Sequence, residues 1–256
     1  MGSCLYFPAH QGLRPLKDSA MLSLGSDLQP GCQMTIDMDE SPPSLSARVD
    51  KIRDIFASLD AKTDLLAQAT GLACPKGCGR CCENPDIEVS AADWLPLAFA
   101  LCQDDKATEM IETLLHVGSE RCIFFESEPT KAGHCSAYQD RPTLCRQFGF
   151  STRESSHGRR EHVACIVHKQ THCDALARVQ AKLDEGITAA SHRDTAMALL
   201  ALEPSLGKEQ RPINLALLEA IQYTALALDM MARSAPPTVS ASGPNRCFDL
   251  EHPDRS

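Results

Sequence analysis

Aromatic residues and positive charge are scarce in this chain of 256 residues, which has 8 Phe, 3 Tyr, 1 Trp and a net charge of −9. A protein that binds nucleic acid or an anionic membrane by general electrostatic attraction needs a surplus of lysine and arginine. We therefore expect neither nucleic acid nor a membrane as a partner. The remaining composition, 43% hydrophobic and 23% charged, excludes a collagen-like or wholly disordered chain.

Long hydrophobic runs are also missing. The best candidate for a membrane span, 213–231, is interrupted by Glu219, Gln222 and Asp229. The first ten residues show no basic flank followed by an apolar run of signal-peptide length. We therefore expect a cytoplasmic protein.

Cysteine, in contrast, is abundant, with 13 residues. A disulfide framework needs an oxidising compartment, whereas cytosolic thiols are held reduced. Metal binding therefore becomes the leading explanation for the cysteines. The sequence has no Walker loop, dinucleotide-binding fingerprint or recognisable nucleophilic triad, so whether the protein is an enzyme stays open.

The pattern of residues predicts a mainly α-helical fold with little β structure, in which helices flank an irregular, loop-rich cysteine and metal module. Helical spacing of apolar residues begins after Ser44, and Gly71 is placed to end that helix. Pro212 fits the first turn of a last helix that is apolar nearly all round, for which core burial is the expected explanation. The predicted segments are a disordered leader at 1–43, an N-terminal helix at 44–73, the cysteine module at 74–173, C-terminal helices at 174–233 and a disordered tail at 234–256.

The densest group of cysteines places four thiols within nine residues, at Cys74, Cys78, Cys81 and Cys82. Neighbouring thiolates repel one another, so such a group is costly unless a metal ion or cluster compensates its charge. The intervening proline and glycines supply a turn-forming backbone that can wrap round a metal centre. A merely reactive or buried group of cysteines is the less favoured explanation.

A second group of cysteines lies downstream, and its central part reads CxxYxxRPxxCRxF over residues 135–148. Together with the dense group and one further cysteine, this motif resembles the YkgJ-type cysteine-cluster family, also called CxxCxxCC, whose domains are described as zinc- or iron-chelating. The resemblance covers about residues 74–168. In this sequence three residues separate the first two cysteines, where other members have two, which leaves the role of Cys74 less well defined.

The resemblance implies eight metal ligands. Cys4, Cys32, Cys102, Cys173 and Cys247 fall outside the motif and are expected to be ordinary thiols. The eight candidates are Cys74, Cys78, Cys81, Cys82, Cys122, Cys135, Cys145 and Cys165.

The spacing of the cysteines favours an iron–sulfur cluster, of the 4Fe–4S type, over zinc. An all-thiolate zinc site commonly uses two paired CxxC knuckles, whereas one tight loop with remote cysteines is more typical of iron–sulfur ligation. The first functional hypothesis is therefore a cluster for electron transfer or redox catalysis, with an unknown protein as redox partner. The alternatives are a zinc-stabilised binding module and, by similarity to domains attached to flagellin lysine methylases, an accessory domain for protein modification.

Local charge agrees with an anionic centre, because residues 121–173 carry a net charge of +3 within an acidic chain. Arg80, Arg141 and Arg146 lie beside proposed ligands and can compensate a thiolate cluster, although solvated side chains are an equal alternative. Asp140 precedes an Arg-Pro pair and is expected to cap a short helix that carries Cys145.

Two further signals have simpler explanations. The spacing of Cys74, Cys78 and Cys81 is that of the radical-SAM cluster loop, but no alternating strand-helix pattern follows it. Four of the six histidines of the module can supply nitrogen ligands, but histidines in loops are usually exposed to solvent. These residues are His134, His162, His168 and His172.

Overall fold

The computed structural model describes residues 43–75, 78–117, 121–128 and 131–234. The predicted disordered leader and tail lie outside this part of the chain, apart from Pro43 and Ser234. Cys4, Cys32 and Cys247 lie outside it as well.

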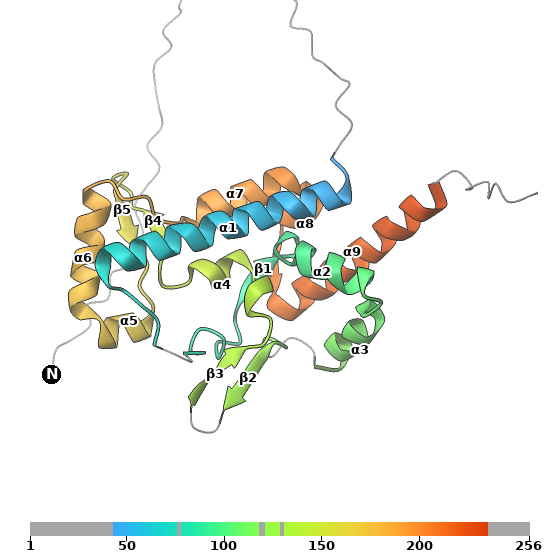
Figure 1. The fold of residues 1–256 in the computed structure, drawn as a ribbon, viewed down its shortest axis with the longest axis horizontal. Coiled ribbons are helices and arrows are strands. Elements are labelled where there is room, and N and C mark those ends of the chain that lie inside the picture. Colours follow the sequence, from blue (N-terminus) through green and yellow to red (C-terminus); the bar gives the residue numbers. More distant parts are fainter. Residues whose placement is uncertain (1–42, 76–77, 118–120, 129–130, 235–256) are drawn as a thin grey trace, which may run out of the picture. The chain divides into compact units, whose positions relative to one another are not determined.

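The described chain is mainly α-helical, which confirms the predicted fold class (Figure 1). Two single turns of 3-10 helix, η1 and η2, precede α2 and α4. The elements are α1 Leu45–Thr70, η1 Ala91–Trp94, α2 Leu95–Gln103, α3 Ala107–Val117, η2 Tyr138–Asp140, α4 Thr143–Gln147, α5 Ile166–Thr171, α6 Cys173–Asp184, α7 His192–Leu202, α8 Pro204–Gly207 and α9 Ile213–Ser234.

The β structure consists of three antiparallel pairs of short strands. The first pair joins the cysteine-rich segment to the C-terminal segment, with Glu88 opposite Pro212. The other two pairs join strands that are neighbours in the sequence, and the sequence did not predict either of them. The strands are β1 Glu88–Ser90 with β6 Gln210–Pro212, β2 Phe125–Glu128 with β3 Lys131–Cys135, and β4 Thr152–Glu154 with β5 Arg160–His162.

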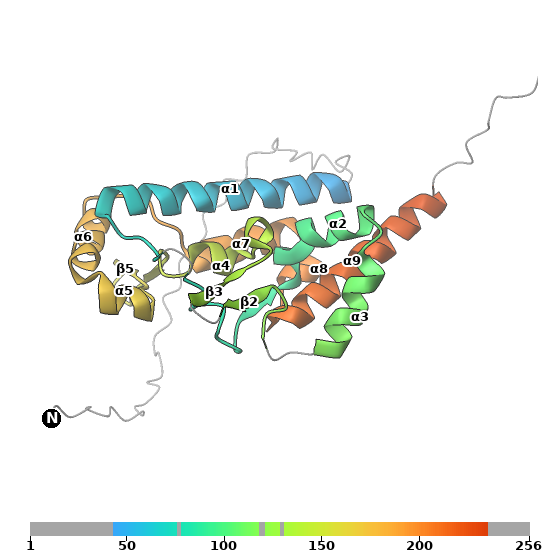
Figure 2. The same cartoon turned by 60° about the horizontal axis from the view of Figure 1, so that its bottom comes forward.

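Helix α1 is the longest element and follows the prediction closely. The Ser44 side chain accepts a hydrogen bond from the Ala47 backbone N–H at 3.2 Å, which caps the first turn. Gly71 ends the helix in the left-handed conformation, with φ of 72°, and its N–H donates to the Ala67 carbonyl. One stripe of the helix is buried, and it faces α2, α4, α6 and α7 (Figure 2).

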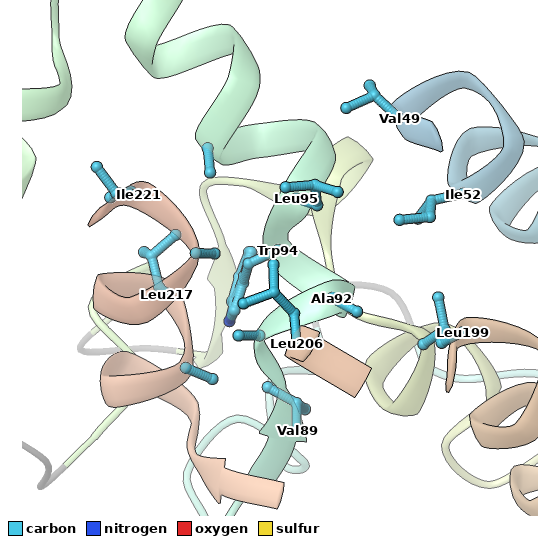
Figure 3. Packing of buried hydrophobic residues seen from close by; sticks show 14 of the residues in the cluster. Val49, Ile52, Val89, Ala92, Trp94, Leu95, Leu199, Leu206, Leu217 and Ile221 are labelled. Carbon is cyan, nitrogen blue, oxygen red and sulfur yellow. The ribbon is translucent and has the colours of Figure 1, made fainter. Parts of the chain in front are cut away.

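The larger hydrophobic cluster is centred on Trp94, which is 1% exposed. Leu95, Leu206 and Leu217 surround the indole ring (Figure 3), whose Nε1 donates a hydrogen bond to the Ile213 carbonyl at 3.0 Å. The first half of α1 packs against the same cluster. The cluster therefore joins α1, α2 and α9 around the only tryptophan of the sequence.

A smaller hydrophobic cluster lies at the other end of α1. It contains Leu66 from α1, Leu72 from the following loop, Phe150, and Val179 with Leu183 from α6. Helix α6 thus buries one apolar face in this cluster, and Ile187, which follows the end of the helix, also packs against it.

Helix α9 is a core helix in its first half only. Seven of its residues between Ile213 and Thr224 are buried, whereas Leu226, Met230 and Met231 are exposed. By length and composition, α9 is the one helix of the described residues that could cross a membrane, contrary to the expectation that no such segment exists. A core helix meets the same criteria, and the buried first half fits that explanation.

Two leucines of α9 test this division of the helix. Leu217 is 0% exposed and Leu226 is 60% exposed. We expect Leu217→Ala to lower the free energy of unfolding by about 2–5 kcal/mol, because it leaves a cavity in the core. Leu226→Ala, the matched control, is expected to change it by about 0.5 kcal/mol or less. Denaturant unfolding measures both; equal losses would contradict the described packing.

Candidate metal centre

Seven of the eight candidate cysteines line one cavity of about 740 Å³, which we call the cysteine cavity. Its wall also contains Trp94 and Ile213 from the larger hydrophobic cluster, and Leu72 and Phe150 from the smaller one. Residues far apart in the sequence therefore converge on one space. The cysteines of the wall are Cys74, Cys78, Cys81, Cys82, Cys122, Cys135 and Cys145.

The dense cysteine segment follows α1 and enters the cavity through two tight turns. The Cys78 N–H donates to the Pro75 carbonyl at 3.0 Å, and the Cys82 N–H donates to the Gly79 carbonyl at 2.9 Å. The second turn reverses the backbone at Cys81 and Cys82, and all four thiols of the segment line the cavity.

The β2–β3 hairpin carries two more cysteines. Cys122 precedes β2, and Cys135 is the last residue of β3, where it lies opposite Phe125 in the ladder. The Ser136 N–H donates to the Phe124 carbonyl at 2.8 Å, which closes the open end of the hairpin. The pairing of the two strands brings the thiols of Cys122 and Cys135 to the same side of the cavity.

Cys145 lies in the short helix α4, and the residue that caps this helix is not the predicted one. Asp93, which is 3% exposed, accepts a hydrogen bond from the Thr143 N–H at 2.9 Å and another from the Thr143 hydroxyl. The same carboxylate accepts from Ser90 at the start of η1, in a capping box. The expectation that Asp140 caps α4 is wrong because Asp140 ends η2, one turn too early.

Arg146 fixes α4 to α1. Its guanidinium donates to the Asp60 carboxylate at 2.6 Å and to the carbonyls of Arg141 and Gln139. The same group lies over the Phe56 ring, 4.2 Å from its centroid. The side chain is 4% exposed, so α1 supplies both the counter-charge and the aromatic face that this buried cation requires.

Of the three predicted arginines, Arg141 and Arg146 line the cysteine cavity and Arg80 does not. Arg141 lies over the Tyr138 ring at 3.8 Å and pairs with Asp60 at 3.2 Å. Arg80 pairs with Glu83, and its side chain is 60% exposed. Of the two expectations for this residue, the structure therefore agrees with a solvated side chain.

Burial makes the thiols of the cavity reluctant to ionise. It raises the pKa of Cys122 to about 11, and it raises the pKa of Cys145 further, with the thiols of Cys122 and Cys81 adding to the effect. Burial, then Cys78 and Cys165, raises the pKa of Cys74 to about 11, and Arg141 opposes this rise. A metal ion that displaces the thiol protons must also supply the positive charge that stabilises the thiolates, because the surrounding protein does not supply it.

Cys81 and Cys82 form a hydrogen-bonded pair of thiols, with 3.9 Å between their sulfur atoms. The hydrogen bond from Cys82 lowers the pKa of Cys81 to about 7, although burial opposes this effect. The same hydrogen bond and burial raise the pKa of Cys82. Cys81 is therefore the thiol of this pair that ionises first.

Cys165 is the one candidate ligand outside the wall of the cysteine cavity. It caps helix α5, and its sulfur accepts a hydrogen bond from the His168 backbone N–H at 3.3 Å. The His168 ring is 0% exposed, and its Nε2 lies 3.7 Å from the sulfur of Cys74. The expectation that the histidines of the module are solvent-exposed is therefore wrong for His168.

The other three candidate histidines lie in different surroundings. His134 is half exposed, with Glu126 at 3.4 Å, and His162 donates its Nε2 hydrogen to the Gly149 carbonyl at 2.7 Å. The ring of His172 packs edge-on against that of His168. Cys102 on α2 and the exposed Cys173 at the start of α6 are not in the wall of the cavity.

The donors fit a thiophilic metal by their chemistry. Thiolate sulfur is the preferred ligand of zinc and of iron–sulfur clusters. Within the described residues, no three Cys, His, Asp or Glu side chains form a group that could hold a metal ion as they stand. The described side chains are therefore not arranged in advance round a single ion.

Sequence reasoning missed three residues that shape the site. Asp93 binds Thr143, which lies 50 residues further along the chain, and no local pattern in the sequence records this contact. No signal in the sequence links Asp60 to Arg146. The burial of His168 has no signal either, because its helix α5 is too short to show a periodic pattern.

The structure thus defines a cysteine-rich module whose thiols converge on a single cavity. Residues 73–176 match the model of the CxxCxxCC family, which carries the description "Putative zinc- or iron-chelating domain". The match confirms the resemblance of this segment to the family, which its motifs predicted. No curated protein and no solved structure matches the chain.

The contact between α1 and α4 can be tested with two aspartates of α1. Asp60→Asn removes the counter-charge of the buried Arg146, and we expect it to lower the free energy of unfolding by about 1–3 kcal/mol. Asp50→Asn is the matched control, because Asp50 pairs with Arg53 where both side chains are exposed. Thermal unfolding of the two variants compares them. Stability of Asp60→Asn equal to that of the unaltered protein would show that Arg146 does not depend on Asp60.

Proposed function

We propose that the cysteine module holds an iron–sulfur cluster of the 4Fe–4S type, and that this cluster serves electron transfer or a redox reaction. The observation that carries the proposal is the convergence of seven cysteines on one cavity of about 740 Å³. The description of the matched family model as a zinc- or iron-chelating domain supports metal binding in general. The choice of the cluster rests on the spacing of the thiols.

The spacing argument compares a single ion with a cluster. Tetrahedral zinc with Zn–S bonds of about 2.3 Å requires its four sulfur atoms to lie about 3.8 Å apart. A cluster separates its cysteine ligands further, because its own iron and sulfide atoms fill the space between them. Thiols spread round a cavity, with no three grouped for one ion among the described residues, agree better with the cluster.

The walls of the cavity suit a redox centre. When bound, such a cluster supplies one-electron transfer. Trp94, Phe148 and Phe150 line the cavity and limit the access of water. Arg141 contributes positive charge beside Cys81 and Cys135, which lowers the cost of an anionic thiolate cluster.

Single cysteine replacements test the ligand assignment. We expect Cys81→Ser and Cys135→Ser each to lower the iron content of anaerobically purified protein by at least about half, because each removes a thiol from the cavity wall. Cys102→Ser, outside the cavity, is the control and should retain full iron content. Iron, sulfide and visible absorption are measured on the same samples. Unchanged iron in both variants would exclude the two-part ligand set.

Zinc is the second candidate, and one distance favours it. The sulfur atoms of Cys81 and Cys82 are 3.9 Å apart, close to the separation of about 3.8 Å that tetrahedral zinc requires. Two adjacent cysteines can thus occupy two positions of one zinc site with little movement. The function would then be that of a zinc-stabilised binding module without catalysis.

Anaerobic purification separates the two candidates. The cluster predicts a brown, oxygen-sensitive protein with iron and sulfide. Zinc alone predicts a colourless protein with about one or two zinc ions per chain, which unfolds when a chelator removes them. A colourless, iron-free anaerobic preparation would rule out the cluster.

The partner and the location of the protein stay predictions from the sequence. We propose a protein as redox partner, no nucleic acid or membrane as partner, and a cytoplasmic location. A role as an accessory domain for protein modification rests on family similarity alone.

A further inference from the structure

The buried His168 lies beside the cysteine cavity, and the iron–sulfur proposal does not use it. His168 is 0% exposed, and buried polar atoms need bonding partners. Both nitrogen atoms of the ring therefore require a partner within the protein. The contacts of these two nitrogens establish which of them carries the hydrogen.

The Nδ1 atom of His168 lies 3.2 Å from the Gly149 carbonyl oxygen. A carbonyl oxygen can only accept a hydrogen bond, so Nδ1 must carry the hydrogen. In the neutral ring Nε2 then has a free lone pair, and this atom lies 3.7 Å from the sulfur of Cys74. A histidine that ligates a metal characteristically donates its other N–H to a carbonyl or carboxylate in this way.

Gly149 allows this approach because it has no side chain. Its φ is +82°, and a Cβ atom at this position would lie 3.0 Å from Cε1 of His168. The backbone of residue 149 thus holds the imidazole in one orientation, with Nε2 toward Cys74.

Two more thiols belong to the same corner of the module. Cys165 starts the helix that carries His168, and its sulfur accepts the His168 backbone N–H at 3.3 Å. Cys78 follows Cys74 through a tight turn, in the same wall of the cavity. Three cysteines and one histidine are a common ligand set of structural zinc sites.

We infer that Cys74, Cys78, Cys165 and His168 close round one zinc ion as a separate Cys3His site, with Nε2 of His168 as its nitrogen ligand. No three of these side chains are grouped for an ion as they stand, so the zinc ion has to draw them together from their present positions. This inference rests on the proposed metal-binding function and assigns the cysteines to two centres. Cys81, Cys82, Cys122, Cys135 and Cys145 remain for the iron–sulfur cluster. The protein then contains two different metals, each with its own group of thiols.

The test uses the full chain, purified anaerobically, and counts zinc and iron separately. His168→Gln should lower the affinity for Zn²⁺ at least about 10-fold and leave the iron content unchanged. His162→Gln is the matched control, because His162 donates to the same Gly149 carbonyl through its Nε2 atom. It should keep both metals.

Two measurements keep the test valid if His168→Gln does not fold. X-ray absorption at the zinc edge of the unaltered protein should show three sulfur atoms and one imidazole nitrogen. His168→Cys should retain zinc with four sulfur atoms, and its Co²⁺ derivative should absorb at longer wavelength.

The outcomes separate this inference from the proposed function. An all-sulfur zinc shell in the unaltered protein, or unchanged zinc affinity in His168→Gln, would overturn the Cys3His site and leave the cluster standing. Iron without zinc in the unaltered protein would also overturn it. A protein without any bound metal would remove both.

Discussion

The cysteine cavity depends on the buried guanidinium of Arg146. This one group contacts Asp60 and Phe56 on α1, and it binds the carbonyls of Gln139 and Arg141 in the segment before α4. A buried cation needs all of these partners, because a hydrogen-bond donor left without an acceptor costs about 1–3 kcal/mol. The requirement fixes α4, and with it Cys145, at a definite place against α1.

Burial keeps most thiols of the cavity neutral in the absence of a metal. Burial raises the pKa of Cys74, Cys122, Cys135 and Cys145, so most of these thiols stay protonated in the metal-free protein. Arg141 alone does not balance several thiolates. A metal centre therefore both deprotonates the thiols and compensates their charge, which couples binding to the stability of the module.

The sequence predicted the features that depend on local chemistry. The start and end of α1 followed from Ser44 and Gly71. The convergence of the cysteines was implied by the family motif. What the sequence could not provide are the contacts between distant segments, such as Asp93 with Thr143 or Asp60 with Arg146, because no local pattern records them.

Each of the two hydrophobic clusters borders one of the two proposed groups of ligands. Cys122 and Cys145 pack against the larger cluster, whereas Phe150 of the smaller cluster contacts the ring of His168. Helix α1 contributes side chains to both clusters, and the cavity lies where both supply part of the wall. Because Cys74 and Cys81 lie in one short loop, the proposed ligands of the two centres are joined by the same few residues. A metal bound at either proposed centre therefore restrains that loop. Conformational entropy that the loop loses when the first metal binds does not have to be lost again when the second metal binds.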